Sequence, residues 1–210
     1  MSTVTKSGVF QLMEERHSVR KYVPDVEIPK SELEEMLQAA SEAPSSWNLQ
    51  HWRFLVIDEK AKKEELLPIG YNQQQIVDCS AVIVILGDVE ANKEADSIYE
   101  EAVKKGSMPK EVKDTLVGQI NSAYSKEGTF ARDEAFLNAS LAAMQIMLAA
   151  KAKGYDTCSM GGFNREALVE AFHIPERFVP VMLLSVGKAE KPGHPSARKP
   201  VSERIIYQSF

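Results

Sequence analysis

Two long apolar runs without polar alternation stand out along the chain, at residues 81–86 (A-V-I-V-I-L) and 179–186. A strand that is covered on both faces has this pattern, because neither face meets water. Shorter runs at 54–57 and 156–159 predict two more strands. The hydrophobic pattern therefore predicts at least four strands, two of them in the interior of a sheet.

Helical spacing of apolar residues separates these runs. The predicted helices are 9–15, one that Pro29 opens and that stops near Pro44, 59–67 ending before Pro68, 133–153, and 165–172. Residues 91–126 are polar and charged, and predict a helical excursion that breaks near 106–109. Alanines occur on most sides of 133–153, so we expect a central helix that its neighbours approach closely, with Gly154 as its cap. Strands interleaved with helices indicate a fold of the α/β or the α+β class.

Composition narrows the class of protein. The 210 residues are 44% hydrophobic and 26% charged, which is typical of one globular domain over 1–210. A net charge of −5 argues against a nucleic-acid partner. Two cysteines and four histidines without ligand spacing predict neither a disulfide framework nor a metal site. With no signal peptide and no uninterrupted apolar span, we expect a cytoplasmic protein away from membranes.

Several nucleotide-binding and hydrolase motifs are missing from the sequence. It has no G-x-x-x-x-G-K-[ST] loop, no G-x-G-x-x-G after a strand and no G-x-S-x-G elbow. Four short polar clusters remain at the ends of predicted elements. The first is R-H-S-V-R at 16–20, where two guanidiniums and a hydroxyl suit a phosphate dianion. A solvent-exposed turn would have the same composition.

The other three clusters also allow two interpretations. Residues 43–52 offer hydroxyl and amide groups beside two tryptophans, which suits the edge of a planar heterocycle but also a helix stop with an Asx turn. Gly161 and Gly162 follow a strand. Without side chains, their backbone N–H groups can approach a ligand, but the two glycines can equally form a simple turn. Arg198 and Lys199 form a cationic pair in an extended tail that starts at Lys188, and solubility alone explains such a pair.

In their order along the chain, these clusters resemble the FMN-dependent nitroreductase family of homodimeric flavoenzymes. The matching motifs are R-H-S-V-R (16–20), P-S-S-W-N-L-Q-H-W (44–52), N-Q-Q-Q-I-V-D-C-S (72–80), G-G-F-N (161–164) and R-K-P (198–200). The resemblance implies an α+β fold, with a mostly antiparallel central sheet flanked by helices in an intertwined homodimer. It also implies bound FMN, with NAD(P)H as co-substrate and a small-molecule electron acceptor.

The resemblance assigns roles to particular residues. The FMN phosphate and ribityl chain would contact Arg16, His17, Ser18, Arg20 and Arg198. The flavin ring region would contact Asn72, Gln75, Gly161 and Gly162, with the Gly161 N–H directed at N5. Across the dimer interface, the partner's flavin would contact Pro44, Ser45, Ser46 and Asn48. No acid, base or nucleophile is expected among the side chains, because hydride transfer occurs at flavin N5.

The implied activity is ping-pong hydride transfer to nitroaromatics, quinones or similar acceptors. Alternatives are a family member with another acceptor (flavin reductase, dehalogenase or dehydrogenase type), a flavin-binding redox protein with little turnover, and a non-flavin interaction module. The sequence departs from a branch of the family at Gln75, where that branch has Lys, and at Gly161, where it has Glu. His51 replaces a usual Pro. Residues 91–126 would lie over the pocket, with Tyr124 and Phe130 as lid or core aromatics.

Overall fold

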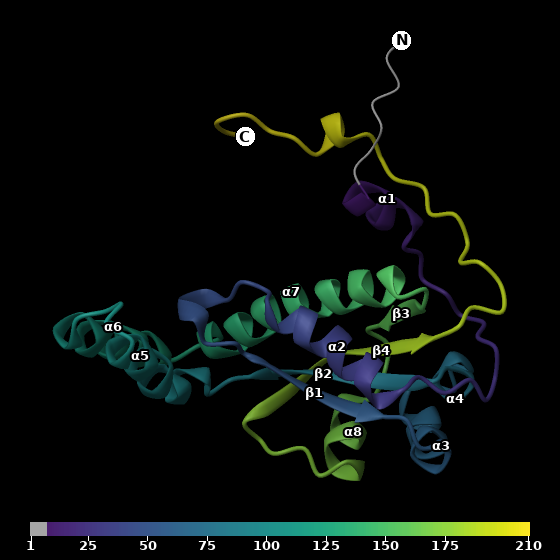
Figure 1. Cartoon of the computed structure of the whole chain (residues 1–210), viewed down its shortest axis with the longest axis horizontal. Coiled ribbons are helices and arrows are strands. Elements are labelled where there is room, and N and C mark those ends of the chain that lie inside the picture. Colours follow the sequence, from purple (N-terminus) through teal and green to yellow (C-terminus); the bar gives the residue numbers. More distant parts are fainter. Residues whose placement is uncertain (1–7) are drawn as a thin grey trace.

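Four antiparallel strands form the centre of the protein, whose computed structural model describes residues 8–210 (Figure 1). They are β1 (Trp52–Ile57), β2 (Ala81–Asp88), β3 (Asp156–Met160) and β4 (Phe178–Gly187), in the order β1-β2-β4-β3. Every pairing between these strands is antiparallel. The fold is therefore α+β as the resemblance implied, and the parallel α/β alternative is excluded.

The sheet is covered on both faces by helices. The helices α2 (Lys30–Ser41) and α7 (Phe130–Ala152) lie on one face, and α3 (Lys60–Ile69), α4 (Gln75–Asp78) and α8 (Arg165–Ala171) lie on the other (Figure 1). All residues of β2 are buried. Its alternate side chains join different cores, since Ile83 and Ile85 pack with α2 and α7 while Val82 and Val84 join the second core. The absence of polar alternation in 81–86 follows directly from this position.

Helix α7 approaches the sheet closely at Gly87. A Cβ at Gly87 would lie only 2.8 to 2.9 Å from the backbone and Cβ of Ala135. Ala139, Ala142 and Ala143 continue the buried face of α7. This confirms the expected close packing of the alanine-rich helix. By length and composition α7 could also cross a membrane, but its buried face belongs to the protein core.

One predicted helix boundary is wrong. Helix α3 continues through Pro68 to Ile69, although the proline was expected to follow its end. Proline lacks an N–H and its ring crowds the carbonyl four residues earlier, but at Pro68 only one residue of the helix, Ile69, follows this disturbance. The Gly70 N–H restores the pattern by donating to the Leu66 carbonyl over 2.9 Å. A proline in a final turn therefore does not stop the helix.

The expected helical excursion is present and projects from one end of the sheet (Figure 1). It contains a short 3-10 turn, η2 (Ala91–Glu94), followed by α5 (Ala95–Lys104) and α6 (Lys110–Tyr124). The break falls at 105–109, and Gly106 adopts a φ of 70° there. A small separate core of Leu49, Ala91, Ala95 and Ile120 joins the excursion to the 44–52 loop.

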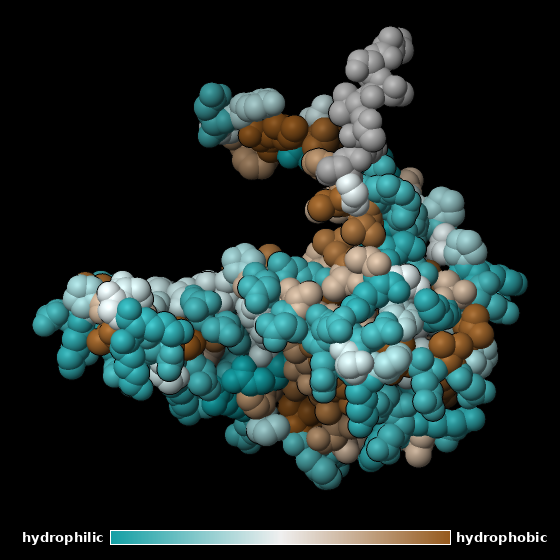
Figure 2. All heavy atoms as spheres, in the orientation of Figure 1, coloured by the Kyte–Doolittle hydropathy of each residue, from teal (hydrophilic) through white to brown (hydrophobic). Residues whose placement is uncertain are grey.

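The two terminal segments expose a large apolar surface. Helix α1 (Gly8–Glu15) has no buried residue, and Val9, Phe10 and Met13 are about half exposed or more. The C-terminal tail extends away from the sheet and carries a 3-10 turn, η3 (Val201–Glu203) (Figure 1). Figure 2 shows apolar atoms gathered on α1 and near the end of this tail. The exposed apolar residues of the tail are Val201, Ile205, Ile206, Tyr207 and Phe210.

A buried ion pair fixes the base of the excursion. Arg177 donates from Nε to Asp88 Oδ1 over 2.8 Å and from Nη2 to Oδ2 over 2.6 Å, and it also reaches Glu94 Oε1 at 2.8 Å. Asp88 is only 1% exposed. These charged hydrogen bonds raise the pKa of Arg177, so the guanidinium stays charged. The end of β2, the start of β4 and the start of the excursion are thereby held together.

We expect Arg177→Met to lower the free energy of unfolding by about 3 kcal/mol, because it leaves the Asp88 carboxylate buried without its cation. Urea unfolding followed by circular dichroism measures this change. Lys105→Met is the control, since its pair with Glu101 is solvent-exposed and should have no measurable effect. Equal losses for the two variants would contradict the assignment of Arg177 as the anchor.

Candidate functional site

Two of the four candidate clusters meet along β3. The Ser18 backbone forms a parallel bridge with Thr157, and the Val19 N–H donates to the Thr157 carbonyl over 3.0 Å. Residues 16–20 thus run beside the outer edge of β3. Gly161 and Gly162 follow the last residue of the same strand. The arginine cluster and the glycine pair are therefore neighbours in the fold.

The segment 72–75 packs on the glycine turn from the other side. Gln73 donates from Nε2 to the Gly162 carbonyl over 2.9 Å. Gln75, which is 6% exposed, donates to Met160 Sδ at 3.3 Å and to Gln73 Oε1 at 3.1 Å. Asn72 has a φ of 55°, a conformation that asparagine tolerates well. The structure thus places Asn72 and Gln75 next to the Gly161–Gly162 turn.

The backbone at this turn is open to a ligand. No heavy atom lies within 4 Å of a Cβ built on Gly161, and a Cβ on Gly162 would meet only a ring carbon of Tyr71 at 4.0 Å. Neither glycine has a positive φ. Internal packing and backbone strain therefore do not require glycine at these two positions. An unobstructed approach to the backbone N–H groups is the remaining physical advantage.

Cationic groups beside this turn have no counter-ion in residues 8–210. Arg16 is half-buried and Arg20 is exposed, and neither forms an ion pair there. Burial raises the pKa of the Cys158 thiol on β3, while the charge of Arg20 and a hydrogen bond from Ser18 act against that rise. His17 Nδ1 lies 2.9 Å from the Glu15 carbonyl. The local charge suits an anion such as a phosphate.

Within residues 8–210, Arg198 has no hydrogen bond to the first cluster. The tail passes the first cluster at Gly193, where a Cβ would lie 2.7 Å from His17 Cβ. Arg198 then lies in the exposed stretch of the tail, where its Nη1 donates to the neighbouring Ala197 carbonyl.

The loop with Pro44, Ser45, Ser46 and Asn48 is also remote from the arginine cluster. It leads into β1, which lies at the opposite edge of the sheet from β3, three strand spacings or about 14 Å away. Trp52 also opposes Gly87 near one end of β2, whereas Thr157 lies in the row of Ala81 at the other end. One chain therefore presents two separate parts of the expected site.

Three residues of this loop adopt left-handed backbone conformations. They are Trp47 (φ 51°), Asn48 (φ 55°) and Gln50 (φ 51°). The Gln50 N–H donates to Ser45 Oγ over 3.0 Å, and the Tyr99 hydroxyl donates to the Trp47 carbonyl over 2.9 Å. Strained backbone of this kind concentrates at functional sites.

Sequence reasoning missed one residue at this loop, Asn138 of α7. Its Oδ1 accepts a 2.9 Å hydrogen bond from the Ser46 N–H. A polar residue on the buried, alanine-rich face of the helix is the signal that could have revealed it.

Comparison with known proteins identifies the family. The model of the Nitroreductase family matches residues 13–188. The chain therefore belongs to the nitroreductase family. It is 54% identical to YodC of Bacillus subtilis, which is named as an NAD(P)H nitroreductase, over 94% of this chain and 97% of YodC. It is 32% identical to the CLA biosynthesis enone reductase of Lactiplantibacillus plantarum, over 92% of each chain.

A solved structure of a family member matches the whole fold. The nitroreductase from Exiguobacterium sibiricum, crystallised in complex with FMN, is 40% identical with a TM-score of 0.89. The match covers 99% of this chain and all of that chain. Family membership makes this protein an oxidoreductase.

The excursion of this nitroreductase meets the strained loop through aromatic residues. The rings of Tyr124 and Phe130 are perpendicular at 5.5 Å, and those of Trp47 and Phe130 lie 6.4 Å apart. The Tyr124 hydroxyl is 2.7 Å from His51 Nε2. Burial raises the pKa of Tyr124, so the hydroxyl stays protonated. Tyr124 packs against the small core of the excursion, and its expected role as a lid residue stays a prediction.

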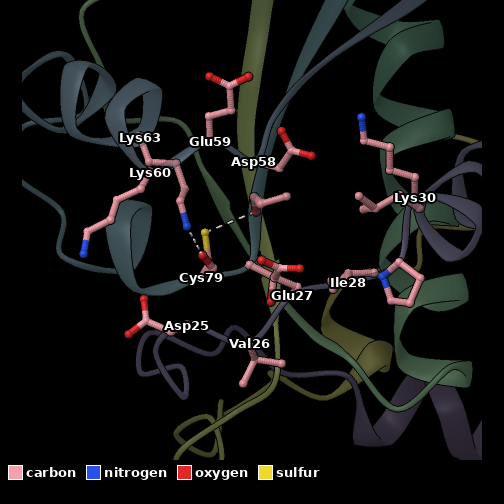
Figure 3. A pocket seen from close by; sticks show the side chains of 14 residues that line it. Asp25, Val26, Glu27, Ile28, Lys30, Asp58, Glu59, Lys60, Lys63 and Cys79 are labelled. Atoms are coloured by element: carbon pink, nitrogen blue, oxygen red, sulfur yellow. Dashed lines mark hydrogen bonds between the residues drawn. The ribbon is translucent and has the colours of Figure 1, made fainter.

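A cavity of about 620 Å³ lies apart from these clusters (Figure 3). Its lining comes from 25–33, 58–63 and 79–81, and includes none of the expected flavin contacts. Figure 3 shows Lys63 pointing at Cys79, whose carbonyl accepts from Nζ over 2.5 Å. Lys63 also donates to the Val77 carbonyl at 3.3 Å. Its buried ammonium thus fixes the turn that leads from α4 into β2.

The environment of His51 generates a pH prediction. His51 is fully buried, and burial lowers its pKa from 6.5 more strongly than Glu134 and Asp88 raise it. The unfolded chain therefore binds the proton first as the pH falls below about 6.5. We expect the free energy of unfolding to decrease there by up to about 1.4 kcal/mol per pH unit.

The matched variant His51→Gln lacks this titration. Urea unfolding of both proteins between pH 7.5 and about 5 isolates the histidine, because all other titrating groups are shared. Parallel pH profiles for the two proteins would contradict the expected contribution of His51.

Proposed function

We propose that this protein is an FMN-dependent oxidoreductase that transfers hydride from NAD(P)H to a nitroaromatic, quinone or similar acceptor. The observation that carries the proposal is the pair Arg16 and Arg20, which have no counter-ion within residues 8–210, near the open backbone of Gly161 and Gly162. A phosphate and a planar ring would together satisfy both features. The FMN complex of the Exiguobacterium sibiricum relative supports the same ligand.

In this proposal each cluster has one role. Arg16, Ser18 and Arg20 bind the phosphate, with His17 beside them and Arg198 closing from the tail. Asn72 and Gln75 contact the ring or its ribityl chain. The Gly161 N–H donates toward N5, and Gly162 contacts the adjacent carbonyl edge. When bound, FMN supplies the hydride chemistry, while these residues orient the ring and place positive potential at the phosphate end.

The active site is shared between two chains in this proposal. Pro44, Ser45, Ser46 and Asn48 contact the flavin held by the partner, since they lie across the sheet from their own chain's arginine cluster. A homodimer would also cover the exposed apolar residues of α1 and the tail. On the outer face of α7, Leu137 (57% exposed), Leu141 and Met144 extend this surface. The cytoplasmic location stays a prediction.

NAD(P)H and the acceptor would use one face of the ring in turn, and ping-pong kinetics follow from a single shared pocket. The relative named as an enone reductase supports a second candidate acceptor, an α,β-unsaturated carbonyl compound. Steady-state oxidation of NADH and NADPH, with nitroaromatics, quinones, enones and free flavins as acceptors, distinguishes these cases. Parallel double-reciprocal plots are expected for the true acceptor. Purified protein that neither contains nor takes up FMN would refute the proposal.

A shared site can be tested by complementation. We expect Arg16→Glu and Asn48→Gly each to lose most activity as homodimers. Glycine is chosen at position 48 because it tolerates the positive φ there. Random mixing of the two chains should restore about a quarter of wild-type activity, because half of the dimers are mixed and each holds one complete site. Activity no higher than the mean of the separate variants would exclude a shared site.

The neutral Gln75 should keep the flavin potential lower than a cation would. We expect Gln75→Lys to raise the midpoint potential by on the order of 30 mV, because a positive charge stabilises the reduced, anionic flavin. Spectroelectrochemical titration measures the shift. Gln74→Lys is the matched control, since this exposed neighbour pairs with Asp78 and should leave the potential unchanged. An unchanged potential in Gln75→Lys would refute the role of Gln75.

A further inference from the structure

Asn138 is a buried amide whose orientation is fixed on both sides. It is 1% exposed on the inner face of α7. Its Nδ2 donates to the Glu134 carbonyl over 2.7 Å and to Glu134 Oε2 over 3.2 Å. Because both of these partners accept hydrogen bonds, the NH₂ group must face Glu134. The carbonyl oxygen Oδ1 therefore faces the Ser46 N–H, at 2.9 Å.

Ser46 is the point where the strained loop begins. The 3-10 turn η1 (Ser46–Asn48) opens with it, and the left-handed residues Trp47, Asn48 and Gln50 follow. Left-handed conformations of non-glycine residues are unfavourable, and they persist only where the surroundings determine them. Asn138 supplies a hydrogen bond to the loop from a helix that is packed into the main core.

Several other contacts of this loop come from the excursion or from the loop itself, and the Asp88 N–H of β2 donates to the His51 carbonyl at its end. Tyr99 and Tyr124 belong to α5 and α6, and Leu49 packs in the small core of the excursion. The Gln50–Ser45 hydrogen bond is internal to the loop. Asn138 adds the hydrogen bond that ties the first N–H of the 3-10 turn to the helix packed on the sheet.

We propose that Asn138 is a positioning residue for the redox reaction, which acts through Ser46 to hold the loop 44–48 at its working distance from the partner's flavin ring. This inference rests on the proposed function, because it needs a flavin at the shared site. Asn138 itself contacts no cofactor or substrate. Its amide aligns the Ser46 backbone, and the loop then encloses the ring.

The test compares wild type and variants, each reconstituted with FMN as a dimer. The three measurements are the visible circular dichroism spectrum, the midpoint potential and the FMN dissociation constant. In Asn138→Leu, which removes both the acceptor and the donor, we expect an altered visible spectrum, a shifted potential and a dissociation constant raised at least threefold. If the leucine variant does not fold, Asn138→Ser replaces it in the test. The serine side chain is too short to reach the Ser46 N–H, so the same changes in spectrum, potential and dissociation constant are expected.

Two further variants separate positioning from stability. Ile146→Val removes one methyl from the same helix at a fully buried site, so it should lower thermal stability and leave all three flavin readouts unchanged. Asn138→Asp combined with Glu134→Gln restores an acceptor for the Ser46 N–H and places an amide donor opposite it. This double variant should recover most of the wild-type spectrum and potential.

The outcomes separate the two proposals. Wild-type protein that does not bind FMN overturns the proposed function and with it this inference. A different result overturns the inference alone. In that case the wild type binds FMN, but Asn138→Leu has the same spectrum, potential and dissociation constant as Ile146→Val. A spectrum and potential that shift in Asn138→Leu and return in the double variant support it.

Discussion

The close packing of α7 on β2 is the constraint on which the rest of the structure depends. Gly87 and Ala135 meet without room for a Cβ on the strand, so the helix lies nearer to the sheet than larger residues would permit. The same helix carries Asn138 under the strained loop and leads through Gly154 into β3. One helix thus connects the two separate parts of the candidate site.

These two parts differ in how they are built. The part beside β3 uses exposed cations and bare backbone, which suits the binding of an anionic, planar ligand. The loop at the other edge uses strained backbone that is held by partly buried hydrogen bonds. In the proposed function, the loop of one chain and the open cradle of the other would form a site whose geometry depends on the dimer.

Elements with a strong local signal were predicted well. The unbroken apolar runs became the two interior strands, because a strand with both faces buried cannot alternate. The end of α3 was predicted wrongly, since a proline in the last turn disturbs the helix too near its end to stop it. Asn138 was overlooked for a different reason. Its partner, Ser46, is 92 residues away in the chain, and no local pattern encodes that contact.

The sequence by itself determined the order of strands and helices, the clusters that could bind an anion, and the resemblance to the nitroreductase family. Local periodicity and residue chemistry are sufficient for these conclusions. Only the tertiary structure decided which clusters meet, because strand order and register bring Ser18, Gln75 and Gly162 together while placing Ser46 at the opposite edge. Such neighbours are set by the packing of whole elements, which a linear pattern does not contain.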